Sequence, residues 1–166
     1  PTNSEHIYVA TPAGGLWEST DNGDTWASLT DTLVAIGASA IAVNPENTDI
    51  IYLATGDGNA NDTYSFGVIR STDGGNSWES TSLAFEIQDQ IRCTDLLMDP
   101  QNPDKIYVTS SQGLFVTEDG GETWDQPLSI FLRDVAIHPG NSDIVYATGT
   151  GFYKSEDGGE SFDQIN

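Results

Sequence analysis

The chain has 166 residues, of which 26 are Asp or Glu and 5 are Lys or Arg, so its formal net charge at pH 7 is -21. A chain this acidic repels phosphate backbones and anionic lipids, which excludes nucleic acid and membrane surfaces as favourable partners. Its apolar runs are all far shorter than the ~20 residues of a membrane-spanning helix, so membrane insertion is not expected. A single cysteine, Cys93, rules out a disulfide within the chain.

Short strands recur along the chain in one order. An apolar run ends at a proline in "SAIAVNP", "TDLLMDP" and "RDVAIHP". A run rich in tyrosine and β-branched residues follows in "IIYLAT", "KIYVTS" and "IVYATG", and "HIYVAT" is an earlier copy. A third run, such as "GVIRS", leads into a polar phrase, and a fourth begins at the aromatic residue that ends this phrase. The alternation and the β-branched and aromatic content predict strands rather than helices.

The polar phrase occurs four times, as "STDNGDTW", "STDGGNSW", "TEDGGETW" and "SEDGGESF". Its aspartate can accept hydrogen bonds from its own turn, and its glycine permits left-handed backbone angles. The final aromatic side chain is expected to pack between sheets. We therefore interpret the phrase as a structural joint, the alternative being a binding site used four times. The residues concerned are Asp21, Gly23, Trp26, Asp73, Gly75, Trp78, Asp119, Gly121, Trp124, Asp157, Gly159 and Phe162.

Four-stranded units repeating at about 40–50 residues are typical of β-propeller blades. The sequence thus predicts an all-β fold, a β-propeller segment of about four antiparallel blades at approximately 1–33, 34–84, 85–128 and 129–166. The first blade lacks its inner strand. Because closed propellers have about 4–8 blades, we expect residues 1–166 to belong to a larger propeller of about seven blades. The remaining blades would come from the same protein or from another chain; the alternative is a four-blade ring with one incomplete blade.

The polar phrase resembles the Asp-box, also called the BNR repeat, although the fourth copy ends in Phe162 rather than Trp. Longer stretches, such as "DLLMDPQNPDKIYVTSSQGLFVTEDGGETW", resemble sortilin-like and BNR-repeat propellers over nearly the whole chain. The resemblance is closest to large secreted bacterial proteins with type IX secretion sorting domains, which implies a secreted or cell-surface location. Activity is poorly specified, because sialidases, family 74 xyloglucanases, sortilin receptors and photosystem assembly factors share this repeat.

One loop, "TGDGNANDTYSFG" from Thr55 to Gly67, is longer than the repeat requires. Its Asp and Asn side chains are spaced like the first half of a calcium loop, but Val68 stands where a bidentate Glu would complete the site. Calcium binding and a solvated turn are therefore both open. Tyr64 and Phe66 are candidates either for stacking on a sugar or peptide ligand or for the core. The candidate calcium ligands are Asp57, Asn59, Asn61 and Asp62.

Asp95 and Asp134 hold equivalent places on two inner strands, five residues before Pro100 and Pro139. They are predicted to line the central channel near the ligand face, where an Asp–Arg pair or hydrated lining is the alternative role. A glycosidase needs two carboxylates about 5–10 Å apart, so these two are the catalytic candidates if the chain belongs to an enzyme.

The leading functional hypothesis is a non-catalytic binding or scaffolding segment with a glycan or protein ligand, because of the repeats, the acidity and the lack of a recognisable catalytic constellation in the sequence. The resemblance leaves two alternatives: a fragment of a polysaccharide-degrading enzyme similar to family 74 glycoside hydrolases, and a sortilin-like peptide-binding propeller.

Overall fold

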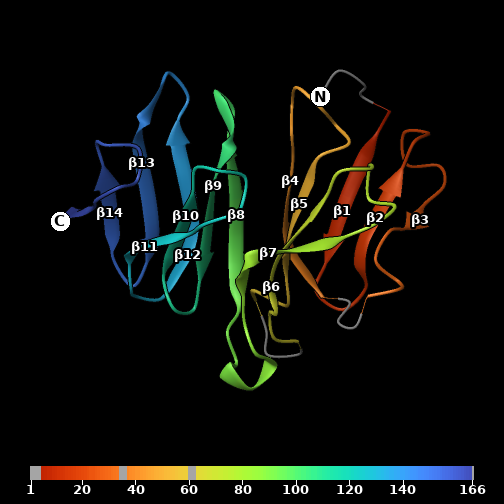
Figure 1. Ribbon diagram of the computed structural model, residues 1–166, viewed down its shortest axis with the longest axis horizontal. Coiled ribbons are helices and arrows are strands. Elements are labelled where there is room, and N and C mark those ends of the chain that lie inside the picture. The colour runs from red at the N-terminus through yellow and green to blue at the C-terminus, as the bar shows by residue number, and fades with distance from the viewer. Residues whose placement is uncertain (1–4, 34–36, 60–62, 166) are drawn as a thin grey trace.

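Antiparallel strands form four sheets in the computed structural model, which describes residues 5–33, 37–59 and 63–165 (Figure 1). Within each sheet the strands are hydrogen-bonded in chain order. The predicted all-β class and the predicted series of antiparallel blades are confirmed. The strands are β1 (Ile7–Thr11), β2 (Gly15–Ser19) and β3 (Ala27–Ser28) in the first sheet; β4 (Ala38–Val43), β5 (Ile51–Thr55), β6 (Gly67–Ser71) and β7 (Glu79–Ala84) in the second; β8 (Cys93–Asp99), β9 (Asn102–Ser110), β10 (Leu114–Thr117) and β11 (Asp125–Leu128) in the third; and β12 (Leu132–His138), β13 (Asn141–Gly149), β14 (Phe152–Ser155) and β15 (Asp163–Ile165) in the fourth.

The first sheet has three strands, and β1, which carries Tyr8, is the counterpart of the other tyrosine-bearing strands β5, β9 and β13. Each outermost strand begins one residue after the aromatic residue of the Asp-box, slightly later than expected, because that residue still belongs to the turn. The short 3-10 helix η1 (Ile87–Asp89) precedes β8. Within the described ranges no helix is long and apolar enough to span a membrane.

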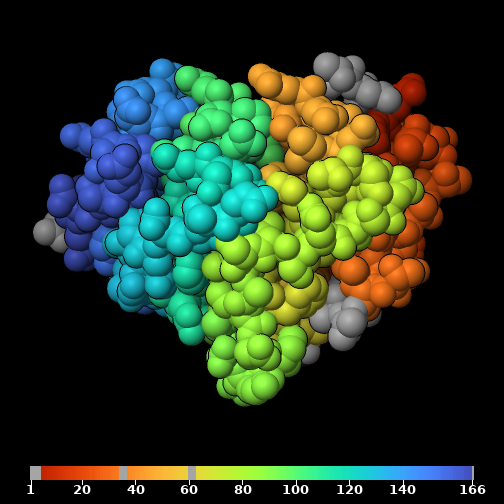
Figure 2. All heavy atoms as spheres, viewed as in Figure 1, coloured from red at the N-terminus to blue at the C-terminus, as the bar shows by residue number. Residues whose placement is uncertain are grey.

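The sheets pack side by side, with β8 in contact with both β4 and β12 (Figure 1). The first and fourth sheets lie at opposite ends of this series, and the space-filling view shows them as the right and left margins of the molecule (Figure 2). The described residues therefore form an open arc rather than a closed ring, which contradicts the four-blade alternative.

The apolar core is divided into clusters that each lie between two neighbouring sheets. Strand β9 illustrates the alternation. Ile106 and Val108 face the second sheet, whereas Tyr107 faces the fourth sheet, and all three are fully buried. Because successive side chains of a strand point to opposite faces, each inner sheet contributes to two clusters.

The Asp-box turns hold one hydrogen-bond pattern in all four sheets. In the third, Asp119 Oδ1 accepts from the Thr117 hydroxyl at 2.7 Å and the Thr123 N–H at 2.9 Å, and Asp119 Oδ2 accepts from the Thr123 hydroxyl at 2.6 Å. The two residues after the aspartate, Gly120 and Gly121, have φ of 69° and 95°, a left-handed conformation that glycine adopts without strain.

Neighbouring sheets are joined through these turns. The Tyr52 hydroxyl donates to the Gly120 carbonyl at 2.9 Å, and the Tyr107 hydroxyl donates to the Gly158 carbonyl at 2.6 Å. The box aromatic Trp124 packs on the cluster between the second and third sheets, and Phe162 packs on the next. The third and fourth turns thus contact the preceding sheet through a backbone carbonyl and an aromatic ring.

Hydrogen bonding lowers the pKa values of the Asp-box carboxyls. The bonds from Thr25 and Ser19 lower the pKa of Asp21 from 3.8 to about 2, and those from Thr123 and Thr117 lower the pKa of Asp119 to about 2. The pKa values of Asp73 and Asp157 are lowered for the same reason.

We expect acid to destabilise the fold through these four groups. Their folded-state pKa values lie below the ordinary 3.8, so their contribution is present above about pH 4 and is lost as the pH falls towards about 2. Asp119→Asn should lower the melting temperature by a few degrees at pH 7 and flatten its decline between pH 4 and pH 2. Calorimetry over this range is the measurement. Asp125→Asn, a neighbouring exposed carboxylate, is the control, and equal pH profiles for the two variants would contradict the assignment.

Candidate functional site

Asp95 and Asp134 lie on the adjacent inner strands β8 and β12. In each strand the pairing shifts register just before the aspartate, between Cys93 and Asp95 and between Leu132 and Asp134. Strand β4 has the same irregularity before Ala40. A bulge of this kind re-aims the side chain that follows it. The repeat therefore places both carboxyl groups at equivalent bulges.

The structure brings these two carboxyl groups together. Asp95 lies close enough to Asp134 for the second carboxyl group to affect its pKa, and the oxygens of Asp95 accept the N–H groups of Leu96 at 2.8 Å and Val135 at 3.3 Å. Val135 belongs to β12, so the bond from its N–H crosses between sheets. Asp95 is half-buried, and Asp134 is exposed.

Burial is the main cause of the raised pKa of Asp95, and the Asp134 carboxyl raises it further by hydrogen bonding and by charge repulsion. The N–H groups of Val135 and Leu96 act in the opposite direction. The exposed Asp134 carboxylate is available as an acceptor for a hydroxyl group.

Catalysis by Asp95 and Asp134 as a pair would require a particular separation of their carboxyl groups. A glycosidase needs two carboxyl groups about 5–10 Å apart around the scissile bond. A catalytic role for Asp95 and Asp134 stays a prediction. The arrangement suits the binding of a hydroxyl-rich ligand. The nearby Arg133 lies over the Phe131 ring, 5.1 Å from its centroid.

The long loop of the second sheet is only partly described, and Asn61 and Asp62 lie outside the described residues. Asp57 is buried, and its Oδ1 accepts the Asn59 N–H at 2.8 Å, as in an Asx turn. Within the described ranges, no group of three or more His, Cys, Asp or Glu residues is placed to hold a metal ion. Calcium binding stays a prediction.

The two aromatic residues of this loop differ in their surroundings. Phe66 packs on the cluster between the first and second sheets, and its N–H donates to the Thr55 hydroxyl at 3.0 Å. This contact corresponds to the core alternative rather than to ligand stacking. Tyr64 is half-buried. Ser65, between them, is fully buried and hydrogen-bonds Thr55 and Cys93.

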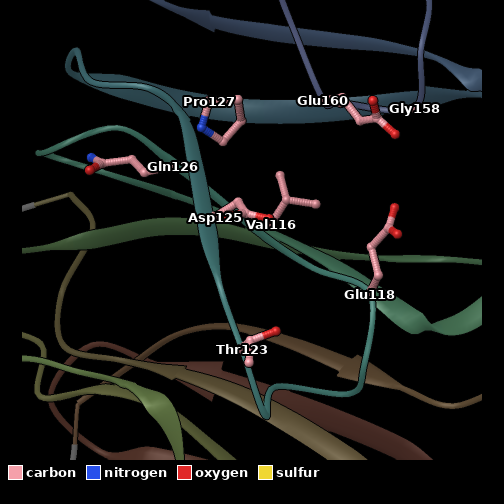
Figure 3. A pocket seen from close by; sticks show the side chains of 9 residues that line it. Val116, Glu118, Thr123, Asp125, Gln126, Pro127, Gly158 and Glu160 are labelled. Atoms are coloured by element: carbon pink, nitrogen blue, oxygen red, sulfur yellow. The ribbon is translucent and has the colours of Figure 1, made fainter.

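A groove of about 580 Å³ that the sequence did not predict lies between β11 and the fourth Asp-box turn (Figure 3). Asp125 and Gln126 line it from β11, and Glu160 lines it from the turn. Glu118, at another side of the groove, pairs with Lys105 at 2.6 Å. Its carboxylates make this groove suited to cationic groups rather than to anions.

One residue explains why this groove is wide. In the narrower counterpart of about 250 Å³ between the second and third sheets, Ser82 donates its N–H at 3.0 Å and its hydroxyl at 3.2 Å to the Gly121 carbonyl. In the third sheet, Pro127 takes the place of Ser82. Each of the two residues directly precedes a leucine, and the carbonyl of that leucine lies against Gly67 in the second sheet and against Gly113 in the third. Proline has neither an N–H nor a hydroxyl, so the bridge cannot form. A proline in an outer strand was the sequence signal for this groove.

The comparisons with known proteins agree with this architecture. Residues 14–129 match the family Sortilin-Vps10, described as sortilin, neurotensin receptor 3. The chain belongs to the Sortilin-Vps10 family. This membership covers the second and third sheets completely, together with most of the first. The association with type IX secretion is not tested by this match and stays a prediction.

Relatives of this Sortilin-Vps10 chain include glycoside hydrolases. It is 31% identical to a xyloglucanase from a Paenibacillus species over 84% of this chain and 15% of that protein. The structure of an ancestral enzyme of glycoside hydrolase family 74 matches 99% of the chain with a TM-score of 0.81 at 23% identity, covering 23% of that enzyme. The family 74 xyloglucanase from Xanthomonas campestris matches 99% of the chain with a TM-score of 0.77 at 20% identity, covering 29% of that enzyme. The chain thus spans less than a third of each of these proteins.

Replacement of Asp95 tests the electrostatics of the carboxyl pair. A raised carboxyl pKa means that the folded chain holds a proton that the unfolded chain releases above about pH 4, so this group lowers stability as the pH rises. Asp95→Asn keeps the shape and cannot ionise. We expect its melting temperature, relative to the wild type, to be higher at pH 7 than at pH 4. Asp143→Asn, an exposed carboxylate on β13, is the control. A pH-independent difference for Asp95→Asn would contradict the raised pKa.

Proposed function

We propose that this chain is part of a larger polysaccharide-degrading propeller of the glycoside hydrolase family 74 type, and that its inner-strand carboxyl pair contributes to binding of a xyloglucan-like chain. The observation that carries this proposal is the 31% identity to a xyloglucanase over 84% of the chain. The structural likeness to family 74 enzymes supports the same architecture. The proposal thus favours the enzyme alternative over the non-catalytic scaffold, which receives no support from these relatives.

The chemistry of the chain fits a neutral, hydroxyl-rich substrate. A net charge of -21 disfavours anionic polysaccharides, whereas a neutral glucan is not repelled. The exposed Asp134 carboxylate can accept hydrogen bonds from sugar hydroxyls.

A peptide-binding propeller is the second candidate, and membership of the Sortilin-Vps10 family is the observation that favours it. Binding without hydrolysis would distinguish it from the first. In both cases the secreted or cell-surface location is part of the proposal.

The proposal is tested by assaying the whole protein for release of reducing sugars from xyloglucan. We expect hydrolysis, and we expect Asp134→Ala to raise KM by about tenfold with little change in kcat, since one hydrogen bond to a charged group contributes about 1.5–3 kcal/mol to binding.

Asp143→Ala, at the opposite end of the β12–β13 pair, is the matched control and should leave both constants unchanged. If the whole protein fails to cleave xyloglucan, the enzymatic assignment is wrong. If cleavage occurs and Asp134→Ala behaves like the control, the role of the carboxyl pair is wrong.

A further inference from the structure

Two grooves on the outer strands are built from equivalent positions: the wide groove between β11 and the fourth Asp-box turn, and the narrow groove between β7 and the third. Arg70 pairs with Glu79 between β6 and β7, and Val116 pairs with Asp125 between β10 and β11. Arg70 and Val116 each lie opposite the tyrosine of the neighbouring strand. Val116 therefore holds the position of Arg70, and Asp125 holds the position of Glu79.

A guanidinium group occupies the narrow groove. Arg70 donates to the Glu79 carboxylate from Nε at 3.2 Å and from Nη2 at 2.8 Å, and its Nη1 donates to the Gly120 carbonyl at 3.3 Å. This carbonyl also accepts the Tyr52 hydroxyl at 2.9 Å, and a carbonyl oxygen can accept two such bonds. Arg70 thus connects a carboxylate of the outer strand to the turn of the next sheet.

The wide groove has the carboxylates without the guanidinium. Val116 is apolar and 7% exposed, so Asp125 lacks the cation that its counterpart has. Glu160 and Glu118 extend towards each other from opposite sides of this groove (Figure 3), and Glu118 pairs with Lys105 at 2.6 Å. Within the described residues, the Asp125 and Glu160 carboxylates form neither an ion pair nor a hydrogen bond.

The rest of the polar lining of the wide groove also favours a donor. The Gly158 carbonyl accepts the Tyr107 hydroxyl at 2.6 Å and, like its counterpart in the narrow groove, can accept a second bond. Pro127 has no N–H to offer, and the Thr123 hydroxyl already donates to the carboxylate of its own turn. A ligand with positive charge and several N–H donors therefore matches this lining.

We propose that the wide groove binds an arginine side chain of a separate polypeptide, whose guanidinium takes the place that Arg70 fills in the narrow groove. The guanidinium donates to the Asp125 carboxylate and to the Gly158 carbonyl, and the Glu160 carboxylate adds to the attraction. Val116 contacts the methylene stem of the bound arginine. Arginine suits the site better than lysine, because its planar fork can bond a carboxylate and a second acceptor at once.

The arginine is assigned to a separate polypeptide because those of this chain are engaged. Arg70 fills the narrow groove, Arg133 lies over an aromatic ring, and Arg92 has a partner of its own. A net charge of -21 also attracts basic polypeptides from solution. In the third sheet, β11 and the inner strand β8, which carries Asp95, are opposite edges, so the site goes beyond the proposed function and does not depend on hydrolysis.

The ligand class is tested by titrating the whole protein with a short peptide that carries one arginine between glycines, followed by ligand-observed NMR. Citrulline has nearly the same shape without the charge, so we expect the citrulline peptide to bind about tenfold more weakly. A lysine peptide should bind with intermediate affinity. If the arginine peptide binds no more tightly than either the citrulline or the lysine peptide, the guanidinium site is wrong.

The position of the site is tested with variants of the whole protein. Asp125→Asn and Glu160→Gln should each weaken binding of the arginine peptide several-fold. Val116→Arg should abolish binding, because the new side chain pairs with Asp125 as Arg70 pairs with Glu79. Glu122→Gln, at the equivalent turn position in the narrow groove, is the matched control and should leave the affinity unchanged. Equal affinities for the wild type, Glu160→Gln and Val116→Arg would place the peptide elsewhere on the acidic surface and overturn the proposal.

Discussion

In each Asp-box turn, hydrogen bonds to one aspartate stabilise a left-handed conformation of the two residues that follow it. The contact between neighbouring sheets depends on that turn. The turn aims a backbone carbonyl at the preceding sheet, where Tyr52 or Tyr107 donates to it. It also orients the aromatic residue that follows. A polar turn with little buried surface of its own therefore determines how two apolar faces meet, and the repetition of this joint produces the arc.

Aspartate serves two opposite electrostatic roles in this chain. In the Asp-box the carboxylate is exposed and accepts several short hydrogen bonds, which favour its charged form. On the inner strands Asp95 is partly buried beside a second carboxyl group, which favours its neutral form. The strand bulges contribute to the difference, because each one re-aims the aspartate that follows it.

The same architecture accommodates more than one function. The Sortilin-Vps10 match and the xyloglucanase relatives fall on the same residues. The four joints account for the shared repeat, but they do not distinguish a receptor from an enzyme. The features that vary between the sheets are the informative ones: the long loop of the second sheet, the carboxyl pair, and the groove that opens where Pro127 replaces a hydrogen-bonding residue.

The sequence by itself determined the strands, their antiparallel order and the Asp-box turns, because these depend on alternation and on hydrogen bonds between residues at most a few positions apart. It also placed Asp95 and Asp134 at equivalent positions. Only the tertiary structure decided that Asp95 is partly buried beside the second carboxyl group, that Phe66 packs in the core, and that Tyr146 and Phe152 stack on the outer face of the fourth sheet. Each of these depends on how one sheet lies against another, a relation between residues distant along the chain that local patterns do not encode.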